Sequence, residues 1–189
     1  MRVIAGSAKG RKLKSPRGPG TRPILDRVKV ALFDILGSLV VGADFLDLFA
    51  GTGSVGIEAL SRGATRAVFV EATSEAVRVI KENRALTGLA DRALVVRQDV
   101  FRFLAQIQEQ QFDIIYVAPP QYRGLVLRTL YALDSKPILS ASGIVVAQWF
   151  PKERAPAALR TLELKMERQY GDTLLSFYGN KAAHPEPVH

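Results

Sequence analysis

Short apolar runs alternate with amphipathic segments along most of the chain, and this alternation predicts its secondary structure. Five runs rich in Val, Ile and Phe are predicted strands: Phe45–Phe49, Ala67–Glu71, Ala93–Arg97, Phe112–Val117 and Gly143–Gln148. Four amphipathic segments are predicted helices: Ser54–Arg62, Ser74–Thr87, Val100–Gln108 and Leu125–Leu133. Apolar strands separated by helices are typical of a doubly wound, mostly parallel α/β sheet with helices on both faces.

The amino-terminal segment departs from this alternation. Arg2–Ala5 and Arg11–Leu13 are predicted to pair as a small hairpin, and a Pro- and Gly-rich loop follows over residues 15–23. Asp26 is then predicted to cap a helix that runs to about Leu36 and stops at Gly37. The apolar face of this helix comprises Val28, Leu32, Ile35 and Leu36.

The carboxy-terminal segment also differs. Leu162–Gln169 and Thr173–Tyr178 flank Gly171-Asp172 and predict a hairpin, one strand of which joins the sheet antiparallel to its neighbour. With 189 residues, 48% of them hydrophobic, the chain is long enough for one well-buried domain and a small appendage. We therefore expect an extension over residues 1–37, a catalytic-type domain over 38–179 and a disordered tail over 180–189.

Composition excludes several kinds of chemistry. The chain has no cysteine, which rules out disulfides, thiolate–zinc sites and cysteine nucleophiles. Its two histidines, His184 and His189, lie in the tail, so we expect neither histidine base catalysis nor a metal site. No apolar run is long enough to span a bilayer and no signal-peptide pattern is present, so we expect a cytoplasmic protein.

The net charge of +8 is concentrated at the amino terminus. Residues 1–30 contain nine Lys or Arg and one acid, whereas the other residues hold 17 of each sign. A basic arm on a balanced domain indicates a nucleic-acid partner; a solvated arm that only aids solubility is the alternative. The candidate nucleic-acid-binding residues are Lys9, Arg11, Lys12, Lys14, Arg17, Arg22 and Arg27.

A glycine-rich turn, Gly51-x-Gly53-x-x-Gly56, connects the first predicted strand to the next helix. Glycines let a ligand approach the backbone, and the free N–H groups of the helix point at it. The spacing also fits a dinucleotide fingerprint. Asp47 argues against that reading, because its carboxylate repels a pyrophosphate but suits an ammonium group such as that of S-adenosylmethionine. A glycine turn that merely packs the helix on the strand is the alternative.

Acidic residues mark the ends of the following strands, where ligands bind in doubly wound sheets. Glu71 is placed to accept hydrogen bonds from ribose hydroxyls, and Asp99 from an adenine amino group. The candidate cofactor-binding residues are Asp47, Phe49, Gly51, Gly53, Glu71, Asp99 and Val100. A dehydrogenase is a weaker reading, because the sequence offers no recognisable partner for hydride transfer.

Several motifs, which together reach from Arg2 to about Gly179, carry a resemblance to a known family. They are Arg2-Val3-Ile4-Ala5-Gly6, Gly10-Arg11-Lys12-Leu13, Arg22-Pro23, Asp26-Arg27-Val28-Lys29, Leu32-Phe33-Asp34, Asp47–Glu58, Val70-Glu71, Lys81-Glu82-Asn83 and Pro119-Pro120. The chain resembles class I S-adenosylmethionine-dependent methyltransferases and, more closely, the RsmD family of 16S rRNA guanine-N2 methyltransferases. The resemblance implies a Rossmann-like, seven-stranded sheet and methyl transfer to an exocyclic base amine.

The resemblance also implies where the acceptor base would bind. In amino-methyltransferases the turn after the fourth strand is usually Asp/Asn-Pro-Pro-Tyr/Phe; its polar groups accept the amine's hydrogens, and its aromatic residue stacks on a flipped base. The corresponding candidates are Ala118, Pro119, Pro120 and Tyr122, although Tyr122 also reads as an ordinary surface residue. No covalent intermediate is needed, since catalysis comes from orientation and polarisation of the amine.

This chain departs from the family turn at two positions. Ala118 stands where Asp or Asn is expected, and Gln121 separates the prolines from Tyr122. Loss of one acceptor typically raises the barrier by about 2–4 kcal/mol, and Gln121 Oε1 or Asp34 is a candidate substitute. Trp149 is expected to pack at the sheet edge rather than stack on a base.

The function that these observations favour is methylation of guanine N2 in 16S rRNA, on naked RNA or the assembled small subunit, by a monomeric enzyme. A DNA amino-methyltransferase acting on adenine N6 or cytosine N4 is the second reading, although the chain leaves no room for the usual target-recognition domain. A nucleic-acid-binding protein that keeps the cofactor fold but is catalytically weakened is the third.

Overall fold

A seven-stranded sheet forms the centre of the protein, with strand order β3-β2-β1-β4-β5-β7-β6. The computed structural model describes residues 1–16, 24–108, 111–121, 123–154 and 158–181. The strands are β1 Asp44–Leu48, β2 Arg66–Glu71, β3 Ala93–Arg97, β4 Phe112–Val117, β5 Leu139–Trp149, β6 Leu162–Tyr170 and β7 Thr173–Asn180. Strands β1 to β5 pair in parallel, whereas β7 is antiparallel to both β5 and β6. The doubly wound, mostly parallel fold class is therefore confirmed.

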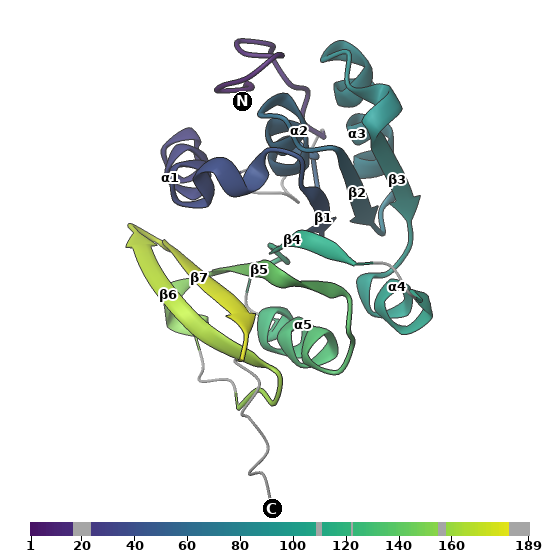
Figure 1. Ribbon diagram of the computed structural model, residues 1–189. Helices are drawn as coiled ribbons and strands as arrows, with labels where there is room; N and C mark the ends of the chain where they lie inside the picture. Colours follow the sequence, from purple (N-terminus) through teal and green to yellow (C-terminus); the bar gives the residue numbers. More distant parts are fainter. Residues whose placement is uncertain (17–23, 109–110, 122, 155–157, 182–189) are drawn as a thin grey trace, which may run out of the picture.

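Helices cover both faces of this sheet. They are α1 Asp26–Leu36, α2 Ser54–Ser61, α3 Ser74–Leu86, α4 Val100–Gln106 and α5 Leu125–Asp134, together with the 3-10 turns η1 Gly37–Val40, η2 Ala90–Arg92 and η3 Pro151–Glu153. Helices α1, α2 and α3 lie on one face, and α4 and α5 lie on the other (Figure 1). In the part of the chain that the structure describes, no helix is both long and apolar enough to cross a membrane.

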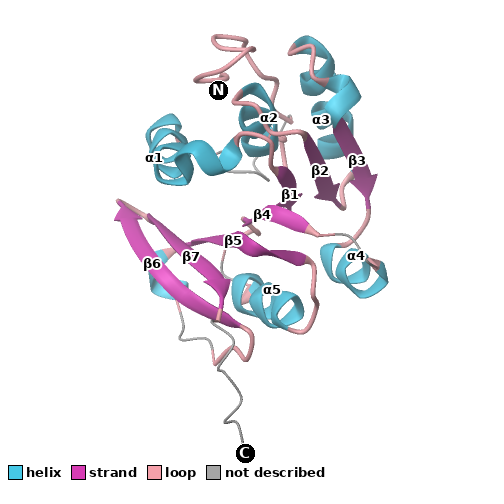
Figure 2. Cartoon of the chain, in the orientation of Figure 1, coloured by secondary structure: helices cyan, strands magenta, loops and turns pink. Residues whose placement is uncertain are grey.

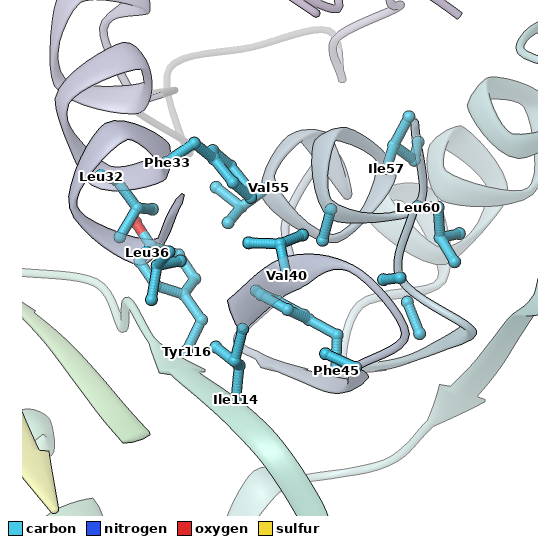
Figure 3. Packing of buried hydrophobic residues seen from close by; sticks show 14 of the residues in the cluster. Leu32, Phe33, Leu36, Val40, Phe45, Val55, Ile57, Leu60, Ile114 and Tyr116 are labelled. Carbon is cyan, nitrogen blue, oxygen red and sulfur yellow. The ribbon is translucent and has the colours of Figure 1, made fainter. Parts of the chain in front are cut away.

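Two hydrophobic clusters, one on each face, hold the layers together. Successive residues of β1 alternate between them: Phe45 packs in the first cluster with α1 and α2, and Leu46 packs in the second with α4 and α5. Figure 3 shows the first cluster, in which Phe33 lies beside Val55 and Val40 lies next to Phe45. Because both faces are buried, the central strands read as continuous apolar runs.

The predicted elements are present, with two informative differences in detail. Strand β5 begins at Leu139, four residues before the predicted start. The prediction missed this part of the strand because the small residues of 140–143 hide the apolar pattern. Its register with β4 shifts there, from Phe112↔Leu139 to Ile114↔Ile144. The predicted cap of α1 is wrong: Leu25 occupies the N-cap position without a side-chain bond, and Asp26 is the first helical residue. Gly37 ends the helix with φ of 52°, as its position predicts.

The amino-terminal hairpin is reduced to one β-bridge, between Arg2 and Lys12. Figure 2 draws the segment mainly as loop, folded over α2. The ladder does not continue because the N–H groups of Ile4 and Ala5 donate elsewhere, to Glu58 Oε2 at 2.8 Å and Oε1 at 2.9 Å. We call residues 1–16 the arm; its Val3, Ala8 and Leu13 are buried in the first cluster.

Glu58 of α2 is the centre of a buried polar network. Its Oε2 lies 3.4 Å from Lys29 Nζ of α1, and both side chains are fully buried. Lys29 Nζ also donates to the carbonyl of Arg2 at 2.7 Å, while Arg62 Nε donates to Glu58 Oε1 at 2.9 Å. Burial lowers the pKa of Lys29, and the nearby charge of Glu58 opposes that shift. The network therefore joins the arm, α1 and α2.

We predict that Glu58→Gln destabilises the protein by about 3–5 kcal/mol, because it leaves Lys29 buried without a countercharge. The new amide NH2 group would also stand opposite the N–H of Ile4 or Ala5, so that one of these two arm donors would lose its acceptor. Urea unfolding measures the change. Glu82→Gln, which removes a partly exposed carboxylate paired with Lys14 and Arg78, is the matched control and should lower stability by less than about 1 kcal/mol. Equal losses of stability in Glu58→Gln and Glu82→Gln would contradict the assignment of Glu58 as the centre of the buried network.

Candidate functional site

The glycine loop between β1 and α2 has an unusual backbone. Directly after β1, Phe49 adopts φ of 60°, and it is the single non-glycine residue with positive φ in the described part of the chain. Gly51 and Gly53 follow with φ of 55° and 73°, and Gly53 forms the N-cap of α2. Such strained positions are held by their surroundings and concentrate at ligand sites. The ring of Phe49 meets Phe101 edge to face, with centroids 6.2 Å apart.

Gly56 is required by close packing rather than by its backbone angles. A Cβ at this position would lie 2.4 Å from Phe69 Cε1 and 3.2 Å from Asp47 Oδ2. The missing side chain lets the Gly56 N–H donate to Asp47 Oδ2 at 3.0 Å. Strand β1 and the first turn of α2 are thereby joined directly beneath the loop.

Asp47 lies inside the protein rather than on its surface. It is only 2% exposed, so it offers little surface to a ligand's ammonium group. Burial raises the pKa of its carboxyl to about 8, although the hydrogen bond from Gly56 acts in the opposite direction. The contact that the structure gives Asp47 is therefore with the first turn of α2.

The other two strand-end acids also bind backbone N–H groups. Glu71 accepts from Gly51 N at 3.0 Å through Oε2, and from the N and Oγ1 atoms of Thr73 through Oε1. Asp99 caps α4, because its Oδ1 accepts from Phe101 N and Arg102 N at 2.9 and 3.0 Å. Asp99 is exposed and Glu71 is half-buried, so both carboxylates remain at the surface of the carboxyl edge. Val100, also a candidate, is buried in the second cluster.

The Pro-Pro turn begins beside the glycine loop. Ala118 N lies 3.5 Å from the carbonyl oxygen of Leu48, to which it donates, so the ends of β4 and β1 are in contact. Pro119, Pro120 and Gln121 line a cavity of about 140 Å³ that is closed by residues 124–127 of the α5 start and by the end of β5. Tyr122 lies outside the described residues.

Three further residues of this cavity were not expected from sequence: Gln148, Trp149 and Glu153. Gln148 Oε1 accepts a hydrogen bond from the hydroxyl of Tyr116, and Glu153 ends η3. Trp149 does not lie at a sheet edge, since β5 pairs with β4 and β7, and it is buried in the second cluster. No hydrogen-bond partner for its Nε1 occurs among the described residues. The only sequence feature that pointed to these residues was the pair Gln148-Trp149, a polar and an aromatic residue at the end of an apolar strand.

The predicted basic residues that lie within the described part of the chain are exposed and belong to two separate elements. Lys9, Arg11, Lys12 and Lys14 lie on the arm, whereas Arg27 approaches the β6–β7 turn, with Nη2 near Gly171. Arg17 and Arg22 lie outside the described residues.

Asn83 fixes the end of the arm to α3 and to the glycine loop. Its Oδ1 accepts from Lys14 N at 2.8 Å, and its Nδ2 donates to the carbonyls of Lys14 and Thr52 at 3.1 and 3.0 Å. The side chain is fully buried. One amide group therefore positions both the arm and the loop.

A parallel sheet with an antiparallel β7 between β5 and β6, a glycine loop after β1 and a Pro-Pro turn after β4 defines a class I methyltransferase fold. Residues 1–179 match the family described as "Conserved hypothetical protein 95", and the chain belongs to this family. The resemblance to the RsmD family is thereby confirmed.

Named relatives cover nearly the whole chain. It is 37% identical to "Putative rRNA methyltransferase YlbH" of Bacillus subtilis, over 94% of this chain and 98% of that protein. It is 34% identical to "Ribosomal RNA small subunit methyltransferase D" of Escherichia coli K12, over 96% and 91%. The solved structure of the Thermus hypothetical protein TTHA0928 superposes with a TM-score of 0.81 at 36% identity, covering 94% of this chain and 98% of that one.

The buried Asp47 generates a prediction about pH. Its folded-state pKa lies above the ordinary 3.8, so the native protein holds an extra proton between about pH 4 and pH 8. The free energy of unfolding should therefore fall as pH rises through this window. Asp47→Asn should flatten the dependence in urea titrations, while the exposed Asp172→Asn should keep the wild-type slope. Parallel slopes for wild type and Asp47→Asn would refute the prediction.

Proposed function

We propose that this chain transfers a methyl group from S-adenosylmethionine to the exocyclic N2 amine of a guanine in small-subunit (16S) rRNA. The names of its relatives and the contact between the ends of β1 and β4, which lead into the glycine loop and the Pro-Pro turn, support this proposal. This contact is the main support for the proposal. The hydrogen bond from Ala118 N to Leu48 O brings the start of the glycine loop, which is the candidate cofactor site, next to the start of the Pro-Pro turn, which lines the candidate cavity for the acceptor base.

The residues at the carboxyl edge fit the cofactor. The backbone at Phe49, Gly51 and Gly53 forms the cradle, and the half-buried Glu71 and exposed Asp99 carry oxygens suited to ribose and adenine groups. The buried Asp47 would shape the cradle through Gly56 rather than touch the ligand. When bound, S-adenosylmethionine supplies an activated methyl group on a sulfonium.

The cavity next to Pro119 would hold the guanine. Its walls are mainly apolar, formed by the prolines, Trp149 and the start of α5, as a base removed from its stack requires. The polar side chains of its lining belong to Gln121, Gln148 and Glu153. A guanine presents the N1–H and N2–H donors on one edge, which a carboxylate such as Glu153 can accept together.

Glu153 would thus supply the acceptor that Ala118 lacks. Asp34, which the sequence suggested as a substitute acceptor, is exposed on α1 and is not among the residues that line the cavity. Transfer forms the N2–methyl bond as the sulfur–methyl bond breaks and its electron pair returns to sulfur. The N2 amine would then lose one proton, and we assign the Glu153 carboxylate, which holds the N2 hydrogens, as the group that accepts it.

The exposed cations of the arm would contact rRNA phosphates. We further propose that the enzyme works as a cytoplasmic monomer, on naked 16S rRNA or on the assembled subunit.

The direct test is incubation of the purified protein with labelled S-adenosylmethionine and 16S rRNA, small ribosomal subunits or duplex DNA. We expect label in RNA, and N2-methylguanosine after digestion and mass spectrometry. Methylated adenine or cytosine in DNA would favour the DNA enzyme. Binding of RNA without methyl transfer to any substrate would favour the non-catalytic reading.

A second test concerns Glu153. Glu153→Ala should lower kcat about 100-fold with little change in KM, because the lost contact polarises the amine in the transition state. Calorimetry should show unchanged affinity for S-adenosylmethionine. Glu163→Gln, at a partly exposed carboxylate on β6, is the control and should keep wild-type kcat. Full activity of Glu153→Ala would remove this residue from the proposed site while leaving the rRNA assay unaffected.

A further inference from the structure

A second hollow, of about 580 Å³, lies on α3 and β3, apart from the Pro-Pro cavity. Its charged residues are Arg78, Lys81 and Glu82 of α3 and Arg97 of β3. The chemistry described above uses none of them. We call this hollow the α3 groove.

The α3 groove carries a net positive charge. Glu82 is shared between Arg78 and Lys14, at 3.1 and 3.0 Å. These cations lower the pKa of Glu82, mainly through the hydrogen bond from Lys14, so it stays ionised. The side chains of Lys81 and Arg97 form neither an ion pair nor a hydrogen bond within the described residues. With Lys14 included, four cations face one carboxylate, which leaves two cations free for an anionic ligand.

The groove continues the arm. Lys14 is fixed to α3 by the hydrogen bonds between its backbone and Asn83, so its ammonium group adjoins the groove through Glu82. Lys9, Arg11 and Lys12 precede it on the exposed side of the arm. One cation of the arm therefore adjoins the groove, although it is distant from α3 in the sequence.

The groove also reaches the edge of the sheet that carries the candidate site. Arg97 is the last residue of β3 and pairs in register with Glu71 of β2. In the order β3-β2-β1-β4, three strand spacings, or about 14 Å, separate β3 from β4, which leads into the Pro-Pro turn. A ligand with regularly spaced negative charges could thus contact Arg97 while one of its bases occupies the cavity.

We propose that the α3 groove binds the phosphate backbone of the RNA segment next to the methylated guanine. The inference rests on the proposed function for the identity of the nucleic acid. Lys81 and Arg97 contact phosphates directly, and Arg78 and Lys14 add to the field while they remain paired with Glu82. The groove extends the RNA-binding surface beyond residues 1–30, the only basic segment that the sequence singled out.

The test compares two double variants of the full chain. Lys81→Ala with Arg97→Ala removes the free groove cations. Arg160→Ala with Arg168→Ala removes two exposed cations at β6, the opposite edge of the sheet. Binding of a transcribed 16S rRNA fragment is measured over a series of salt concentrations. The groove variant should lose about tenfold or more in affinity, and the slope of log K against log salt should fall by about 1.4, or 0.7 per lost phosphate contact.

Further measurements decide how the result is read. The charge-preserving pair Lys81→Arg with Arg97→Lys should retain wild-type binding, and thermal melting should show that each variant is folded. Equal losses in the groove and β6 variants, or no loss in either, would overturn the proposal. Reduced calorimetric affinity for S-adenosylmethionine with unchanged RNA binding would instead assign the groove to the cofactor. Binding of wild type, but not the variant, to phosphatidylserine vesicles with unchanged RNA binding would assign it to a membrane.

The two proposals fail in different ways. If wild type transfers no methyl group to rRNA, the proposed function fails, whatever the salt slopes show. If wild type methylates rRNA and the groove variant keeps its salt slope, only the groove assignment fails.

Discussion

The buried carboxylate of Glu58 is the interaction on which the arrangement of this protein depends. It receives N–H groups from the arm, the ammonium of Lys29 in α1 and the guanidinium of Arg62, the residue directly after its own helix. A buried ion pair adds little net stability compared with an apolar pair, but leaving either member alone is strongly unfavourable. The network therefore favours one relative placement of three segments that hydrophobic packing by itself would allow to shift.

A similar principle operates at the candidate site. Three acidic side chains at successive strand ends bind backbone N–H groups: Asp47 holds Gly56, Glu71 holds Gly51, and Asp99 holds the first turn of α4. The positive φ of Phe49 is maintained between these anchored points. The acids thus form the cradle before any ligand arrives, which lowers the ordering needed on binding.

Much of the fold could be predicted because the central strands are buried on both faces and their helices are amphipathic. The sequence pattern failed where tertiary contacts replace local ones. The arm does not form the expected hairpin because Ile4 and Ala5 donate to a residue more than 50 positions away. The glycine loop and the Pro-Pro turn were found from their residue types. Glu153 and the α3 groove were not, because their significance comes from neighbours that are distant in sequence.

The three hydrogen bonds of the Asn83 side chain connect the arm and the glycine loop to the same residue of α3. Its amide group holds Lys14 on one side and the carbonyl of Thr52 on the other. A displacement of the arm at Lys14 is therefore transmitted to the loop through this side chain. Since linkage between two binding events is reciprocal, stiffening of the loop by one ligand would also change how firmly the arm is held for the other. Arm and loop are then a coupled pair of contacts rather than independent modules.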